Sequence, residues 1–180
     1  PNVGNYYKIW AIDSYRNVET VSDTLVFNSA NAPGTPTDSA ISTSSINTII
    51  NTNANPSTTE YAIKVGTQYV QVDGSLNTSE VWQTYTIWGG SSGKNITGLT
   101  ANTQYTISIK AKNGDGDETS FSTSESKYTL ASAVTGVSLA NATTGSSYGL
   151  SLTWTNGTQN GIKIDLSSVG GGACDATYDV

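Results

Sequence analysis

Apolar side chains occupy every second position in several stretches of the chain. In residues 105–112 the odd positions carry Tyr, Ile, Ile and Ala, while the even positions carry Thr, Ser, Lys and Lys. Residues 61–65, 150–154 and 162–166 show the same alternation. Because successive side chains of a β-strand point to opposite faces of a sheet, this pattern predicts strands with one buried face. No stretch of useful length has the spacing of an amphipathic helix, so the sequence predicts an all-β fold.

Turn signals separate the predicted strands at short intervals. They are combinations of Gly, Pro, Asn and Asp that favour tight turns. They lie at residues 32–36, 55–57, 73–74, 89–93, 113–116, 156–157 and 160–161. This spacing leaves about seven strands between residues 40 and 130, the number that an immunoglobulin-like sandwich needs.

A weak internal repeat sets the expected domain organisation. Ile9 and Ala11 recur as Ile109 and Ala111. A second match, again about 100 residues apart, supports the same period. A period of this length corresponds to one sandwich module. The sequence therefore predicts one whole module flanked by two incomplete ones.

The middle of the chain resembles one module of the fibronectin type III family. Residues 96–105, Ile-Thr-Gly-Leu-Thr-Ala-Asn-Thr-Gln-Tyr, are similar to the family's Gly-Leu-x-Pro-x-Thr-x-Tyr signature, with Ala101 in place of the proline. Residues 107–116 resemble the F strand and the start of the F–G loop. The resemblance implies immunoglobulin-like β-sandwiches in tandem, with Leu99 in the structural motif. It also implies that Tyr105 is the corner tyrosine, its ring in the core and its hydroxyl bonded to nearby backbone.

The tryptophans fit this resemblance unevenly. Trp154 occupies the place of the B-strand core tryptophan in the third module. The middle module has no tryptophan in its B segment, residues 46–50, but the long stretch of residues 70–93 carries Trp82 and Trp88. One interpretation is that the core tryptophan of the middle module lies in that stretch.

The resemblance divides the chain into three segments. Residues 1–31 look like the last strands, F and G, of a preceding module, residues 32–131 like a complete fibronectin type III-like module, and residues 132–180 like strands A to C of a following one. Residues 32–36 resemble the proline-bearing linker that opens a module. Because half a sandwich exposes backbone polar groups and an apolar face, neither flank is expected to be stable alone. One hypothesis is that strands A to C at the end of one copy pair head to tail with strands F and G at the start of the next copy. The other hypothesis is that these residues are a section of a longer continuous chain.

Composition argues against most classes of enzyme. The chain has no His, which removes His-based triads, His general bases and His-ligated metal sites. Charged residues make up 12% of the chain, whereas 51 of the 180 side chains are Ser or Thr. A net charge of −6, with the basic residues scattered, argues against nucleic acid as a partner. No apolar run approaches the roughly 18 residues that span a bilayer, and we expect neither a membrane span in this segment nor a cofactor.

Two groups of residues are candidates for binding. Asn113, Asp115 and Asp117 alternate along an acidic loop, as calcium ligands do, although tight-turn chemistry explains the same residues. Trp10 and Trp88 are candidates for contact with a glycan or another partner, with core packing as the alternative.

Cys174 is the single cysteine and has two interpretations. Its thiol either pairs with a cysteine elsewhere in its own module or forms a cross-link between subunits. No pair of carboxylates can be argued to converge on a substrate.

These features together favour a non-catalytic, extracellular or cell-surface structural protein. Such a chain would be part of a surface fibre, an adhesin stalk or a filament subunit, with neighbouring modules or copies of itself as partners. The alternative is an accessory or carbohydrate-binding section of a large secreted polysaccharide hydrolase. A component of a phage or viral fibre is a third possibility, because such a fibre would be stabilised in the same way and the sequence does not distinguish the two.

Overall fold

The computed structural model describes residues 5–8, 13–17, 24–27, 29–144, 147–165 and 177–179. Across these residues the regular structure consists of antiparallel β-strands and one short 3₁₀ helix at Gly90–Ser92. The prediction of an all-β fold is confirmed.

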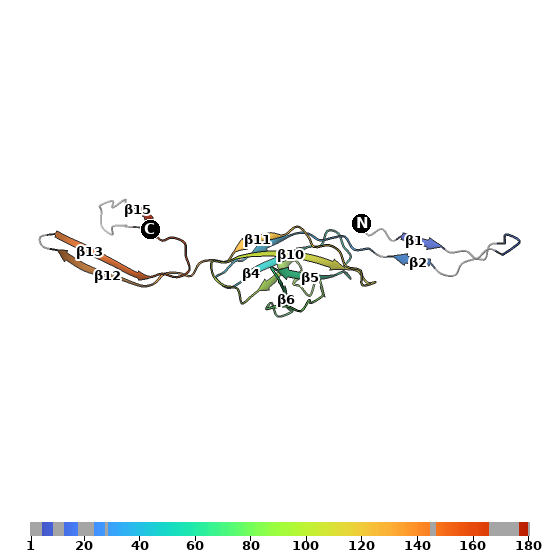
Figure 1. The fold of residues 1–180 in the computed structure, drawn as a ribbon, viewed down its shortest axis with the longest axis horizontal. Helices are drawn as coiled ribbons and strands as arrows, with labels where there is room; N and C mark the ends of the chain where they lie inside the picture. The colour runs from blue at the N-terminus through green and yellow to red at the C-terminus, as the bar shows by residue number, and fades with distance from the viewer. Residues whose placement is uncertain are drawn as a thin grey trace.

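Two sheets form the central part of the molecule (Figure 1). The first has the strand order β3–β4–β9. Its strands are β3 (Gly34–Ser39), β4 (Ile46–Asn51) and β9 (Lys94–Ile96). In β4, Ile46, Thr48 and Ile50 are buried and the residues between them are not, so the strand has one core face.

The second sheet has the order β11–β10–β5–β6–β7. The short strand β8 pairs with Glu60 and Tyr61 of β5, whereas β6 pairs with Lys64 and Val65. Its strands are β5 (Glu60–Val65), β6 (Gln68–Val70), β7 (Leu76–Asn77), β8 (Gln83–Thr84), β10 (Gln104–Lys112) and β11 (Glu125–Tyr128). In β10, Ile107, Ile109 and Ala111 are completely buried, as the alternation predicts.

One hydrophobic cluster joins the two sheets. The first sheet contributes Ile46, Ile50 and Ile96, and the second contributes Tyr61, Ile63, Val65, Val70, Ile107, Ile109 and Ala111. Trp88 and Leu99 enter the cluster from the connections between strands. Burial of each large side chain contributes about 1.5–3 kcal/mol before the entropy cost, so this cluster is the main source of the fold's stability.

The remaining strands form separate two-stranded sheets. They pair β1 (Asn5–Lys8) with β2 (Thr24–Phe27), β12 (Thr135–Thr144) with β13 (Ser147–Thr155), and β14 (Lys163–Asp165) with β15 (Thr177–Asp179). In Figure 1 the β12–β13 hairpin extends from one end of the central sheets, and β1–β2 lies beyond the opposite end.

The proline-bearing segment at residues 32–36 is partly a strand. β3 begins at Gly34, and its register with β4 shifts between Gly34 and Thr37. Pro36 is buried at this irregularity. Proline donates no hydrogen bond, but an edge strand with a bulge has room for it, and β3 is at the edge of its sheet. The segment that resembles a linker therefore already belongs to the first strand of the sheet from Gly34 onward.

Candidate functional site

Trp88 lies in the centre of the core and is 1% exposed. Its indole N–H donates a hydrogen bond to the backbone carbonyl of Tyr61 at 2.7 Å. The chain turns sharply just beyond it, where a Cβ on Gly89 would lie 2.1 Å from the carbonyl oxygen of Gly93. Because the ring has no open face for a sugar, the expectation of a glycan or partner contact at Trp88 is wrong. The structure supports the interpretation that residues 70–93 supply the core tryptophan.

The corner between β9 and β10 is held by Tyr105. Its hydroxyl accepts a hydrogen bond from the backbone N–H of Thr100 at 2.9 Å, and its ring packs against the core cluster. Leu99 is 6% exposed and belongs to that cluster. These are the contacts that the family resemblance implies for the two residues.

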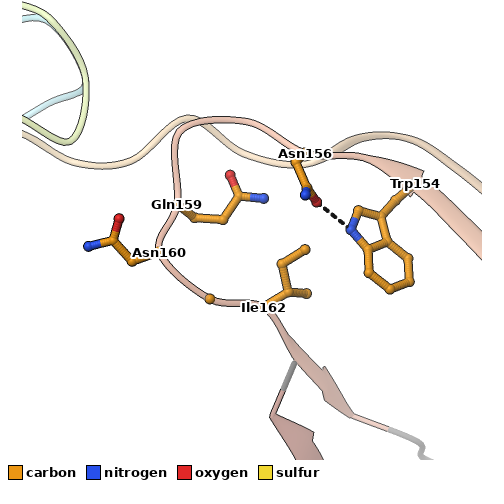
Figure 2. Close-up of a pocket in the computed structure, with 6 residues that line it drawn as sticks. Trp154, Asn156, Gln159, Asn160 and Ile162 are labelled. Carbon is orange, nitrogen blue, oxygen red and sulfur yellow. Dashed lines mark hydrogen bonds between the residues drawn. The ribbon is translucent and has the colours of Figure 1, made fainter.

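Trp154 is only partly buried, at the end of β13. Its indole N–H donates to the Oδ1 of Asn156 at 2.6 Å, and Figure 2 shows both residues beside Gln159 and Ile162. The hollow between them has a volume of about 160 Å³ and is lined by Trp154, Asn156, Gln159, Asn160, Gly161 and Ile162. We expected Trp154 in the core of the following module, and this stays a prediction: among the described residues, β12 and β13 form hydrogen-bonded ladders only with each other.

Lysines and aromatic rings cover the outer face of the second sheet. We call this set the lysine–aromatic cluster, and its members are Lys64, Trp82, Lys110, Lys112 and Phe121. The ammonium nitrogen of Lys110 lies 5.0 Å from the ring centre of Trp82 and 5.4 Å from that of Phe121. Lys112 approaches the Trp82 ring to 4.6 Å. Lys64 approaches the Phe121 ring to 5.1 Å, so cations and rings alternate across the sheet.

Glutamates balance the charges of this cluster. The Nζ of Lys110 lies 2.8 Å from an oxygen of Glu80 and 2.5 Å from one of Glu118. Lys112 lies 2.9 Å from Glu60. Burial by itself would lower the pKa of Lys110, but hydrogen bonds to Glu118 and Glu80 outweigh it and raise that pKa above its usual range. Lys110 therefore stays charged between its two rings.

Sequence reasoning missed the lysine–aromatic cluster. The alternation in residues 105–112 places Lys110 and Lys112 on the face away from the core, where a solvated position is the usual expectation. The ring of Trp82 comes from a distant segment and that of Phe121 from the connection between β10 and β11, and only the fold brings both to this face. The one signal was lysine at two alternate positions of a single strand.

The acidic loop uses its oxygens to close a turn. The Oδ1 of Asn113 accepts hydrogen bonds from the backbone N–H groups of Asp115 and Asp117, at 3.0 and 2.8 Å. The backbone N–H of Asn113 also donates to the carbonyl of Asp117. In the described part of the chain, no group of three or more acidic or cysteine side chains is placed to hold a metal ion. A calcium site at Asn113, Asp115 and Asp117 stays a prediction.

Asp38 is a half-buried carboxylate on the first sheet. Its Oδ1 accepts a hydrogen bond from the hydroxyl of Thr48 at 2.8 Å, and Thr48 is completely buried. Burial raises the pKa of Asp38, and the hydrogen bond from Thr48 opposes that shift. Asp38 therefore supports the packing of β3 on β4.

Trp10 and Cys174 lie outside the described residues. No helix within the described ranges has the length and apolar character needed to cross a membrane. Comparison of the chain with protein-family models gives no match, and no curated protein matches it at a significant level.

Proposed function

We propose that the chain is a section of a non-catalytic, extracellular or cell-surface structural protein built from tandem fibronectin type III-like modules. It would serve in a surface fibre, an adhesin stalk or a filament. The proposed segments are residues 1–31, 32–131 and 132–180, with only the middle one a complete module. The observation that carries this proposal is a common offset between the strands of the three segments.

The strands that open the central unit have counterparts about 100 residues later. β12, β13 and β14 begin 101, 101 and 103 residues after β3, β4 and β5. On the other side, β10 and β11 begin 99 and 101 residues after β1 and β2. Strands β3 and β4 form an antiparallel pair, as do β12 and β13, β1 and β2, and β10 and β11. A tandem repeat of one module produces this combination of offset and pairing.

The strand order of the central unit supports the family part of the proposal. If β3, β4, β5, β9, β10 and β11 are strands A, B, C, E, F and G, the sheets have the orders A–B–E and G–F–C. Immunoglobulin-like sandwiches place these strands in the same two groups. Tyr105 then stands near the start of strand F, where the corner tyrosine belongs.

The central unit suits a mechanical role. Its core joins two sheets, and β10 forms hydrogen-bonded ladders with both β5 and β11, so unfolding must expose the core and break several ladders together. The chain as a whole is rich in Ser and Thr and has few charged residues, so its solubility should depend little on salt concentration.

Single-molecule force spectroscopy tests this proposal. A polyprotein of the chain, pulled from its ends, is expected to show one cooperative unfolding step per copy. Unfolding of about 100 residues, at roughly 3.4 Å each, lengthens the chain by about 34 nm minus the folded end-to-end distance. A chain that extends smoothly, without such steps, would contradict a mechanical role.

A carbohydrate-binding section of a larger hydrolase is the second candidate. Its support is the Trp154 hollow, where an aromatic ring stands beside the amides of Asn156, Gln159 and Asn160. A glycan array distinguishes the two functions. Binding to a polysaccharide that Trp154→Ala abolishes and Trp82→Ala retains would favour this candidate, and no binding to any glycan would remove it.

A further inference from the structure

The segment that leads into β3 is held by the loop between β4 and β5. The backbone N–H of Asn31 donates to the Oδ1 of Asn55, and the Nδ2 of Asn55 donates to the carbonyl of Asn31, each at 2.8 Å. In the same loop, the side chain of Asn53 donates to the carbonyl of Ala32 at 2.9 Å. Loop side chains thus satisfy backbone groups of a segment that lies outside any strand.

The segment that leads into β12 has a corresponding contact. The backbone N–H of Ser132 donates to the hydroxyl of Thr158 at 2.8 Å. Ser132 lies 101 residues after Asn31, and Thr158 lies 103 residues after Asn55, which are the offsets that separate the strands. A Cβ on Gly157 would lie 2.5 Å from the carbonyl oxygen of Ser132, so this close approach requires glycine.

Asn102 adds a contact from the preceding unit. It lies at the corner between β9 and β10 and has a positive φ of 49°. Its side-chain nitrogen donates to the carbonyl of Thr158 at 2.5 Å and to the Oδ1 of Asn160 at 2.8 Å. Its backbone N–H donates to the carbonyl of Leu130. One residue therefore joins the corner of the central unit, the segment that leaves it and the loop that follows β13.

We propose that Asn102 and residues 157–160 form a docking contact between successive modules and hold them at a fixed orientation. The partner of the Asn102 corner is the loop after the second strand of a following module of the same kind. The inference rests on the proposed function, because it treats β12–β13 as the opening of a module. Neutral amides and a hydroxyl make the contact, so the orientation should not change with ionic strength.

Distances between spin labels test the docking contact. We would attach nitroxides at the exposed positions Ser124 and Ser138, each changed to Cys in a Cys174→Ser background. The unmodified junction is expected to give one narrow distance distribution, equal at low and high salt. Asn102→Gly keeps the positive φ and removes the amide, and should broaden the distribution by about twofold or more, as expected for a freed linker.

Asn53→Gly is the matched control. Asn53 has the same φ of 49° and a side-chain contact at the other junction, so its loss should leave the distribution between positions 124 and 138 unchanged. If Asn102→Gly also lowers the urea midpoint of the central unit, Gly157→Ala replaces it as the test. Its added Cβ would clash with the carbonyl of Ser132 and should broaden the same distance distribution without changing the central unit.

Two results would overturn the docking contact. One is a distribution in the unmodified junction that is as broad as in Asn102→Gly, and the other is no broadening in either junction variant. Either result leaves the modular proposal intact, because unfolding steps of the expected length would then identify an array with flexible joints. If force spectroscopy showed no unfolding steps but the distance distribution between the spin labels were narrow, the mechanical role would be rejected and the docking contact would stand.

Discussion

Trp88 enters the core from a turn, and its one polar atom still has a partner there. The indole N–H donates to the carbonyl of Tyr61, a residue of β5 that is itself completely buried. A buried N–H without a partner would cost roughly 1–3 kcal/mol, so this hydrogen bond is needed for the ring to be accommodated. The single side chain therefore fixes residues 85–93 against the second sheet.

Trp88→Phe should lower the free energy of unfolding by about 2–4 kcal/mol, because it leaves a cavity and removes the hydrogen bond to the Tyr61 carbonyl. Urea denaturation followed by far-ultraviolet circular dichroism measures this change. Trp82→Phe is the control, since its smaller ring can still contact Lys110 and Lys112, and its effect should stay below about 1 kcal/mol. Equal losses in the two variants would show that Trp88 is not the centre of the core.

At the scale of the element, β10 uses both of its faces. Ile107, Ile109 and Ala111 face the core, and Lys110 and Lys112 hold rings on the other side. Ala62, opposite Lys110 in the register, is completely buried although it lies on the outer face of β5. The lysine–aromatic cluster thus forms a second packed layer over the sheet.

Lys110→Met tests that layer. Methionine keeps most of the apolar stem but leaves Glu80 and Glu118 without their cation, so the free energy of unfolding should fall by about 1–3 kcal/mol. The Lys110 side chain is 12% exposed, whereas Lys127, which pairs with Glu125, is 39% exposed. Lys127→Met is therefore the matched control and should shift the unfolding midpoint much less in the same denaturation experiment, because an exposed ion pair contributes little. A Lys110→Met effect no larger than the control would mean that the outer layer does not stabilise the fold.

For the whole molecule, strands could be predicted from the sequence but long-range contacts could not. Alternation identifies β5 and β10, because period 2 is a local property of an extended chain. Residue 88 lies in a turn, where no period tells which way a side chain points. The burial of Trp154 depends on a second sheet, and the lysine–aromatic cluster depends on which side chains from outside β10 lie next to Lys110. Those contacts follow from how the two sheets pack together, and the local pattern of apolar and polar residues does not reveal that packing.

Hydrogen exchange should separate the central unit from the β12–β13 hairpin. Amides of β4, β5 and β10 lie in sheets that share one core, so they exchange only when the whole unit unfolds. β12–β13 is a two-stranded sheet, which is marginally stable in water, and Val137 and Leu139 on it are 62% and 63% exposed. Its amides should therefore exchange about a thousandfold faster or more than those of β10, as mass spectrometry of peptic peptides can measure.

The opposite result would be equally informative about how the chain assembles. If β13 exchanged as slowly as β10, a second sheet would have to cover the hairpin in solution and bury Val137 and Leu139. Dilution separates the two possible sources of that sheet. Protection that falls with dilution would come from another copy of the chain, whereas protection independent of concentration would come from the chain itself. In the first case the β12–β13 face is an interface between subunits, and the module it opens is completed by assembly.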